Sequence, residues 1–138
     1  MKRFINVTVM VIMMLFCMST ISHAQTYYYK TKEFAIKYKE SYGWGKWSDW
    51  KPSDMKMKID MDDDIIVIYS QQTQIYRVIE DMGSYTDEYG GKQQKFWVID
   101  QDDDYGYVRL RIEKNGNSQI YIDFNDVMWV YNVVRVTY

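Results

Sequence analysis

An acidic stretch in the second half of the chain has the residue spacing of a calcium-binding loop. Asp100, Asp102 and Asp104 alternate with other residues, and Gly106 follows shortly afterwards. Carboxylates at every second position can converge on one calcium ion when the loop curls around it. The stretch departs from the EF-hand pattern, because Arg111 stands at the twelfth position, which a glutamate occupies in that pattern. We therefore expect a solvated turn, with a weak calcium site of the extracellular type as the alternative.

Three tryptophans spaced three residues apart form a second candidate site. Trp44, Trp47 and Trp50 lie in a loop-like stretch that also contains Asp49 and Lys51. Exposed indole rings beside charged groups can stack on sugar rings or on the aromatic groups of a partner. The alternative is that the three rings fill one end of the hydrophobic core, since large aromatic side chains are buried on average.

The residue types of common catalytic sites are scarce. The only cysteine, Cys17, and the only histidine, His23, lie in the first 24 residues. Without them the chain cannot build a Ser-His-Asp triad, a Cys–His pair or a zinc site of thiolates and imidazoles. Paired carboxylates could still hydrolyse glycosidic bonds, but aspartate and glutamate concentrate in turns here. We therefore expect no enzyme and no cofactor, with a glycan-acting hydrolase as the least favoured alternative.

The first 24 residues have the pattern of a secretory signal peptide. Lys2 and Arg3 precede an apolar run over residues 9–18, and the small residues Ser22 and Ala24 occupy the third-last and the last position of the segment. The apolar run is shorter than the roughly 20 residues that a membrane span requires. We therefore predict cleavage after Ala24, a secreted or periplasmic location and no transmembrane span.

Removal of residues 1–24 leaves residues 25–138 as a single domain, long enough to bury a stable core. The removed segment holds two of the 17 basic side chains and none of the 19 acidic ones, so the remainder carries a net charge of −4. A mildly acidic chain without a basic cluster does not fit nucleic acid or an anionic membrane surface as a partner.

Short runs in which apolar and polar residues alternate follow one another along this domain, and helical periodicity is absent. Turn residues separate the runs, which predicts an antiparallel meander. The expected strands cover residues 34–39, 55–61, 65–69, 74–80, 96–99, 107–112, 119–124 and 128–131. The stretch over residues 81–91, with three glycines, is expected to be the longest loop.

This pattern predicts an all-β fold. Eight antiparallel strands joined by short turns suit a small closed or nearly closed barrel. Closure would also remove the exposed strand edges that favour aggregation. A two-sheet sandwich is the alternative, because the order of hairpins along the chain does not distinguish the two architectures. Residues 65–69 are apolar on both faces and should form a covered central strand.

The pairing of the central hairpin can be predicted from its alternating faces. A three-residue loop, Asn115–Asn117, keeps the apolar residues of both strands on one face. It sets Arg109 opposite Asp123 and Arg111 opposite Tyr121, where directly opposed Cβ atoms are about 4.5–5.5 Å apart. We therefore expect an ion pair in the first case and a ring stack in the second.

The last hairpin should turn at Asn125–Asp126, which places Trp129 and Tyr131 inside the fold. The opposite face then carries apolar residues such as Val130, too many for bare solvent. We expect Tyr27–Tyr29 or a second copy of the chain to cover this face. The second case would produce a homodimer through the C-terminal strand.

Several short motifs resemble those of small exported bacterial β-proteins of unknown function. They are the tryptophan pair before the Met-Lys strand, Ile68–Ser70, the acidic turn after Ile99 and the closing Trp129–Asn132. This resemblance implies export and a β fold, and it implies no known active site. Gly45–Trp47 also resembles the Gly-x-Trp motif of lipocalins, which opens the first strand in that family but follows a strand here.

Together these features predict an exported, non-enzymatic binding or interaction module with a protein or glycan partner. A small barrel that carries an apolar ligand is the alternative from another class. A cavity of several hundred Å³ inside the barrel would favour the carrier, whereas an interior filled by side chains would speak against it.

Overall fold

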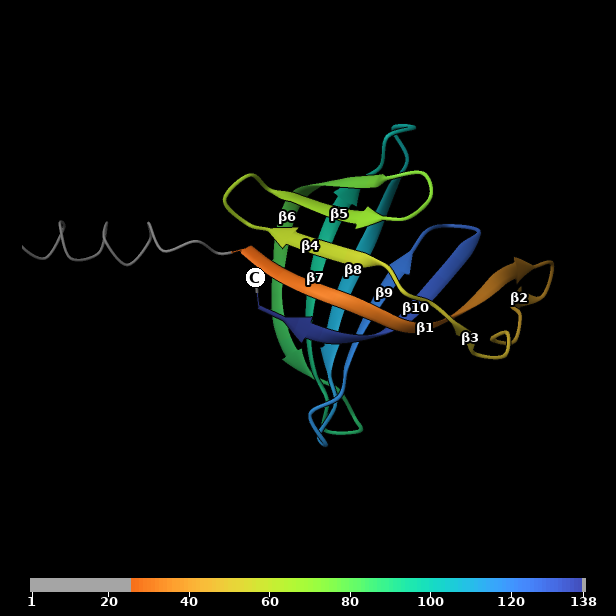
Figure 1. Cartoon of the computed structure of the whole chain (residues 1–138). Coiled ribbons are helices and arrows are strands. Elements are labelled where there is room, and N and C mark those ends of the chain that lie inside the picture. Colours follow the sequence, from red (N-terminus) through yellow and green to blue (C-terminus); the bar gives the residue numbers. More distant parts are fainter. Residues whose placement is uncertain (1–25, 138) are drawn as a thin grey trace, which may run out of the picture.

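The computed structural model describes residues 26–137, and the predicted signal peptide lies outside this range. All regular structure within it is β (Figure 1). The strands are β1 (Thr26–Glu40), β2 (Gly43–Trp44), β3 (Lys51–Pro52), β4 (Lys56–Asp60), β5 (Ile65–Tyr69), β6 (Gln74–Thr86), β7 (Lys92–Ile99), β8 (Tyr105–Ile112), β9 (Ser118–Asp123) and β10 (Val127–Val136). The described residues include no helix that is long and apolar enough to cross a bilayer.

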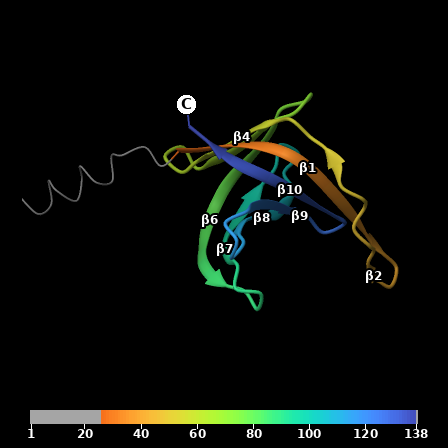
Figure 2. The same ribbon diagram turned by 60° about the horizontal axis from the view of Figure 1, so that its bottom comes forward.

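Eight of these strands form a closed antiparallel barrel. Their order is β10-β9-β8-β7-β6-β5-β4-β1, and β1 also pairs with β10, which closes the ring. Figure 2 shows β1 and β10 side by side, opposite the curved wall of β6, β7 and β8. The short strands β2 and β3 pair with β1 outside this order. The predicted barrel of eight strands is therefore confirmed, and the sandwich alternative is wrong.

Side chains from all eight barrel strands fill the interior. Those that are at most 5% exposed are Tyr29, Met57, Ile59, Ile66, Ile68, Tyr76, Phe96, Val98, Val108, Ile120, Ile122, Tyr131 and Val133. Within each strand they stand at every second position, because successive side chains point to opposite faces. Burial of a large apolar side chain contributes about 1.5–3 kcal/mol, so this cluster is the main source of stability.

Strand β6 is longer than the sequence predicts. A loop was expected over residues 81–91, but β6 continues to Thr86 with β7 as its partner. Its register with β7 shifts twice, and Gly83 within the second irregularity has a φ of +85°. Such bulges insert residues on one strand and so interrupt the alternation of apolar and polar positions. A search for period-two alternation therefore does not recognise the second half of β6 as a strand.

The central hairpin keeps its predicted faces but pairs two residues away from the predicted register. Arg109 lies opposite Tyr121 instead of Asp123, and Arg111 lies opposite Gln119. A shift of two residues leaves every side chain on its own face, so the core is unchanged.

The turn of this hairpin explains the shift. It extends over Glu113–Asn117, where the Glu113 N–H donates to the Asn117 carbonyl oxygen at 2.7 Å. Gly116 has a φ of +91°, as expected for a type I turn followed by a glycine bulge. The loop proper is therefore Lys114–Gly116, which has the predicted length of three residues but lies one residue earlier in the chain. A displacement of the loop by one residue moves the pairing of the two strands by two residues.

The predicted register of the last hairpin is confirmed. The Phe124 N–H donates to the Val127 carbonyl oxygen at 2.9 Å across the two-residue turn. Trp129 pairs with Ile122, and Tyr131 is one of the buried core residues.

The outer face of β10 is covered from within the same chain. Val130 points outward yet is only 3% exposed. The segment between β2 and β3 lies beside β1, where the Ser48 N–H donates to the Ile36 carbonyl (2.8 Å) and the Ser48 hydroxyl accepts from the Ile36 N–H (3.0 Å). This segment carries Trp47, whose ring meets that of Tyr121, the cross-strand neighbour of Val130. Tyr27–Tyr29 are part of β1 and pair with β10 and β4, so the prediction that they cover this face is wrong. The homodimer stays a prediction.

Candidate binding face

Two of the three predicted site tryptophans lie together on the outside of the barrel. The Lys37 ammonium is 5.7 Å from the Trp44 ring centroid and 4.5 Å from that of Trp47. The Trp47 ring meets the Tyr121 ring edge-on, with centroids 6.2 Å apart. Each of the two indoles is 38% exposed. These rings therefore do not fill the core but form part of an outer surface.

The third tryptophan stands apart from the other two. Trp50 is 45% exposed and lies next to β3. It lines neither of the hollows described below.

The outward residues of β7 to β10 and β1 form transverse rows, because antiparallel pairing sets them side by side. One row consists of Lys95, Arg109, Tyr121, Val130 and Ala35. The next row consists of Trp97, Tyr107, Asp123, Met128 and Lys37. Aromatic rings and charged groups therefore lie next to one another along the wall.

Arg109 is the centre of this surface. It donates from Nε and Nη2 to the two carboxylate oxygens of Asp123, at 2.5 and 3.2 Å, and from Nη1 to Gln93 Oε1 at 3.3 Å. Its guanidinium carbon is 4.3 Å from the Tyr121 ring centroid. The predicted ion pair with Asp123 thus forms across a diagonal, and Arg109 rather than Arg111 stacks on Tyr121. Burial raises the pKa of the Tyr121 phenol, which therefore stays neutral at physiological pH.

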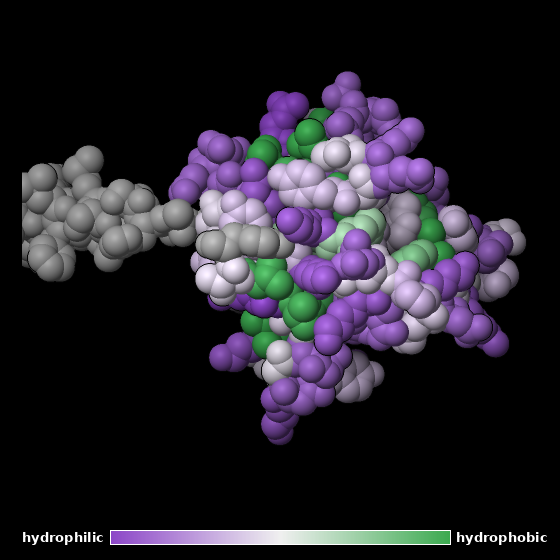
Figure 3. All heavy atoms as spheres, in the orientation of Figure 1, coloured by the Kyte–Doolittle hydropathy of each residue, from purple (hydrophilic) through white to green (hydrophobic). Residues whose placement is uncertain are grey.

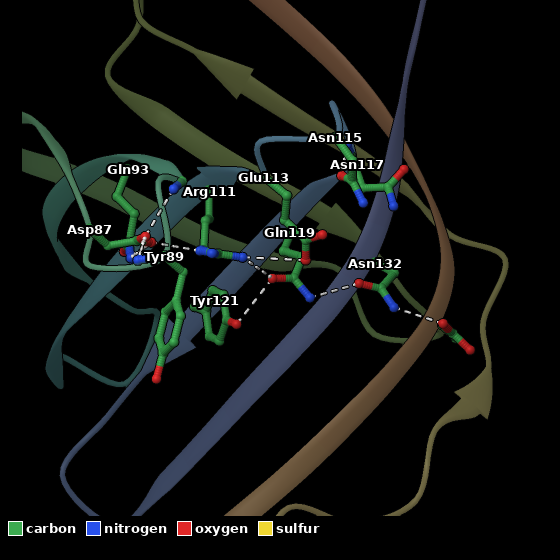
Figure 4. A network of polar contacts seen from close by, with 12 residues as sticks. Asp87, Tyr89, Gln93, Arg111, Glu113, Asn115, Asn117, Gln119, Tyr121 and Asn132 are labelled. Atoms are coloured by element: carbon green, nitrogen blue, oxygen red, sulfur yellow. Dashed lines mark hydrogen bonds and ion pairs between the residues drawn. The ribbon is translucent and has the colours of Figure 1, made fainter.

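A chain of polar side chains continues from here across β8, β9, β10 and β1 (Figure 4). Arg111 Nε donates to Asp87 Oδ2 at 2.8 Å, and Arg111 Nη1 donates to Gln119 Oε1 at 3.3 Å. Gln119 Nε2 donates to Asn132 Oδ1 at 2.9 Å, and Asn132 Nδ2 donates to Glu33 Oε1 at 2.7 Å. Every member has a partner, and such satisfied networks hold side chains in one arrangement.

Asp87 anchors the loop between β6 and β7 to this network. Its Oδ1 accepts the N–H groups of Tyr89 (3.0 Å) and Gly91 (2.9 Å), while its Oδ2 also accepts from Gln93 Nε2 (2.9 Å). The hydrogen bond from Arg111, followed by that from Gln93, holds the pKa of Asp87 well below its usual range. The carboxylate is therefore ionised at any physiological pH, and Tyr89 is held at the rim.

Two neighbouring hollows lie on this face, and we call them together the outer groove. The first has a volume of about 420 Å³ and is lined in part by Lys37, Trp47, Tyr89, Gln93, Arg109 and Tyr121. The second has a volume of about 390 Å³ and is lined in part by Trp44, Trp97, Tyr105, Tyr107 and Asp123. Met128 lines both. Each volume lies within the range of roughly 300–1,000 Å³ typical of ligand sites.

The acidic turn lies at one end of the barrel, where its hollow adjoins the second hollow of the outer groove and shares Tyr105, Phe124 and Asn125 with it. Asp100 Oδ1 accepts the backbone N–H groups of Asp102 and Asp104, both at 2.9 Å, so this oxygen stabilises the turn itself. Asp100 and Asp104 line a hollow of about 610 Å³ whose wall includes Trp129, whereas Asp102 does not. Within residues 26–137 no group of three or more His, Cys, Asp or Glu side chains is placed to hold a metal ion.

Several groove residues were not singled out from the sequence. Asp87, Gln93 and Trp97 are among them, and Asp87 falls in a stretch that the sequence predicts to be loop. The signal for Trp97 was present, because it alternates with the core residues Phe96 and Val98. An aromatic residue on the polar face of an alternating strand is a useful indicator of a binding surface.

No family model, curated protein or solved structure matches this chain. The geometry of the outer groove is therefore the basis for assigning a function.

Proposed function

We propose that this protein is an exported, non-enzymatic module that binds glycan chains in the outer groove. The observation that carries the proposal is the juxtaposition of exposed aromatic rings with polar groups held in fixed positions. At the first hollow the Trp47 ring meets Tyr121, which stacks on Arg109, and Arg109 is held in turn by Asp123 of the second hollow. Export rests on the predicted signal peptide.

Glycans suit this arrangement because a sugar ring has apolar C–H faces and a polar edge of hydroxyl groups. Half-exposed rings such as Trp44 and Trp47 offer large, rigid contact areas at a low cost in conformational entropy. Arg109 donates three hydrogen bonds to side-chain oxygens, which leaves some of its five N–H groups for a ligand. Because the network already holds these groups, binding orders few additional side chains.

The filled centre of the barrel argues against a carrier that encloses its whole ligand. Core residues such as Phe96, Ile68 and Ile122 are at most 2% exposed and occupy the centre where a carrier would enclose its ligand. The hollows lie at the ends and on the outside of the barrel.

The carboxylates of the groove argue against a hydrolase. A glycosidase needs two carboxyl groups about 5–10 Å apart, one of them protonated as a general acid. Asp123 is paired with Arg109, and Asp87 is paired with Arg111. The lowered pKa of Asp87 is the opposite of what a general acid requires.

A glycan array probed with the purified protein tests the proposal, followed by titration of the best ligand. Trp47→Ala should weaken binding roughly tenfold or more, as truncation of an aromatic hot spot does. Trp50→Ala is the matched control, because Trp50 is similarly exposed but lies outside the groove. Since Trp47 also packs against Tyr121 on the barrel wall, Tyr105→Ala in the second hollow provides an independent variant.

Two results would contradict a glycan function. One is an array without any bound glycan, and the other is equal affinity of the Trp47 and Trp50 variants. Capture of a protein from envelope extracts that depends on Trp47 would reassign the groove to a protein partner.

A further inference from the structure

A separate hollow of about 270 Å³ lies inside one end of the barrel, where β1 begins and β10 ends. Its wall includes Tyr27, Ile59, Phe96, Leu110 and Arg135. We call it the barrel mouth. In Figure 3 hydrophobic atoms reach the surface in the lower left part of the domain, where Figure 1 places the end of β10.

Unequal strand lengths create this hollow. β4 and β5 have five residues each, whereas β6 has 13. β6 pairs with β5 only over Gln74–Arg77, and its later residues pair with β7 alone (Figure 1). The wall of β6, β7 and β8 therefore extends beyond its neighbours and leaves inward-facing apolar residues without a covering layer. Ile112, on the same face as Val108, is 44% exposed for this reason.

The cation at the rim of the barrel mouth has no counter-ion within the part of the chain that the structure describes. The Arg135 guanidinium carbon is 4.7 Å from the Tyr27 ring centroid, and Arg135 forms no ion pair among residues 26–137. The acidic residue of the mouth is Asp81, whose Oδ1 accepts the Gly83 N–H (2.9 Å) and whose Oδ2 accepts from Gln94 Nε2 (3.0 Å). Both oxygens of Asp81 are thus engaged, unlike the guanidinium of Arg135.

We propose that the barrel mouth binds a fatty-acid-type carboxylate, with the carboxylate on Arg135 and the tail against Phe96, Leu110 and Ile112. An apolar hollow with one unpaired arginine at its rim is complementary to an anion with a short apolar tail. The guanidinium fork fits a carboxylate with two parallel hydrogen bonds. The site lies inside the barrel end and shares no lining residue with the outer groove, so it does not depend on the proposed glycan function.

Calorimetric titration with three ligands of equal tail length tests this assignment: octanoate, octanol and octyltrimethylammonium. Octanoate should bind roughly fivefold more tightly than octanol, as a partly exposed ion pair provides. Octyltrimethylammonium should bind more weakly than both. Adding methylene groups to the carboxylate should raise the affinity about fourfold each until the hollow is filled.

Two variants separate the roles of head and tail. Arg135→Gln should reduce octanoate binding to the level of octanol and leave octanol unchanged. Ile112→Ser, at a position exposed enough to tolerate it, should weaken all three ligands. Trp47→Ala is the control that must leave octanoate binding intact. Equal affinities for octanoate and octanol, insensitivity to Arg135→Gln, or failure of all three ligands to bind would each overturn the assignment.

Discussion

Substitution of Gly106 by alanine should destabilise the barrel through a steric clash. Gly106 is buried in β8 opposite Val98, next to the aromatic ring of Phe124. A Cβ atom there would lie 2.6 Å from the Asp123 carbonyl oxygen and 2.9 Å from two ring carbons of Phe124, whereas ordinary contacts begin at 3.4 Å. The closest neighbour is backbone, which cannot swing away as the end of a side chain can.

The magnitude follows from two opposing effects. Gly106 does not have a positive φ, so alanine can adopt its backbone conformation. Without a clash, the loss of entropy in the unfolded chain would stabilise the protein by about 0.4–1 kcal/mol. Insertion of a methyl group into a packed site costs about 1–3 kcal/mol. We therefore expect a net loss of about 1–2 kcal/mol from Gly106→Ala.

Urea unfolding followed by tryptophan fluorescence measures this change, and a double-mutant cycle with Phe124→Ala assigns it. Removal of the ring should reduce the cost of Gly106→Ala without abolishing it, because the Asp123 carbonyl oxygen remains. If Gly106→Ala is neutral or stabilising, the close approach of β8 and β9 described here is incorrect.

Three further predictions concern the core, the network and the acidic turn. Phe96→Ala should lower the free energy of unfolding in urea by about 3–5 kcal/mol, and Trp97→Ala, at the neighbouring outward-facing position, should lower it clearly less. The reverse order would mean that the inner and outer faces of β7 are assigned incorrectly. Because the folded pKa of Asp87 is lowered, its ionised form stabilises the protein above pH of about 4, and this contribution should be lost as the pH falls further. The melting temperature should fall less between neutral and acidic pH in Asp87→Asn than in the unmodified protein. An equal fall in both proteins would refute the role of Asp87. Calcium titration should reveal no affinity better than about 10⁻⁵ M. In unfolding experiments, Asp100→Ala should lower the free energy of unfolding by about 1–2 kcal/mol because its turn hydrogen bonds are lost, and Asp102→Ala should change it little. Tight calcium binding, or equal effects of these two substitutions, would contradict this account of the turn.

Local sequence patterns were sufficient to predict the register of a hairpin where a two-residue turn fixes the pairing of its strands. In the last hairpin, the two-residue turn before Val127 allows one register, and the structure has it. In the central hairpin, three-residue loops at two positions one residue apart keep the same faces. The apolar pattern cannot separate registers that differ by two residues, so the residues predicted to lie directly opposite Arg109 and Arg111 were wrong, although the ion pair of Arg109 with Asp123 forms.

The candidate groove was only partly accessible from the sequence. Residue type and exposure preference pointed to Trp44 and Trp47, but equally to Trp50, which lies elsewhere. What distinguishes Trp47 is its contact with Tyr121, a residue on a strand far along the chain. That contact exists because β1 closes the barrel against β10 and carries the neighbouring segment over the outer face.

The sequence by itself determined which side chains face the core, since alternation within a strand depends only on neighbouring residues. It also determined the antiparallel all-β class, because eight alternating runs with short turns leave few other ways to bury their apolar faces. The choice of a closed barrel over a sandwich was decided by the pairing of β1 with β10, which only the tertiary structure shows. The tertiary structure decided how far β6 extends past β4 and β5, and thereby the barrel mouth with its unpaired Arg135. It also decided which outward residues share a row, because that depends on registers between strands that local patterns do not encode.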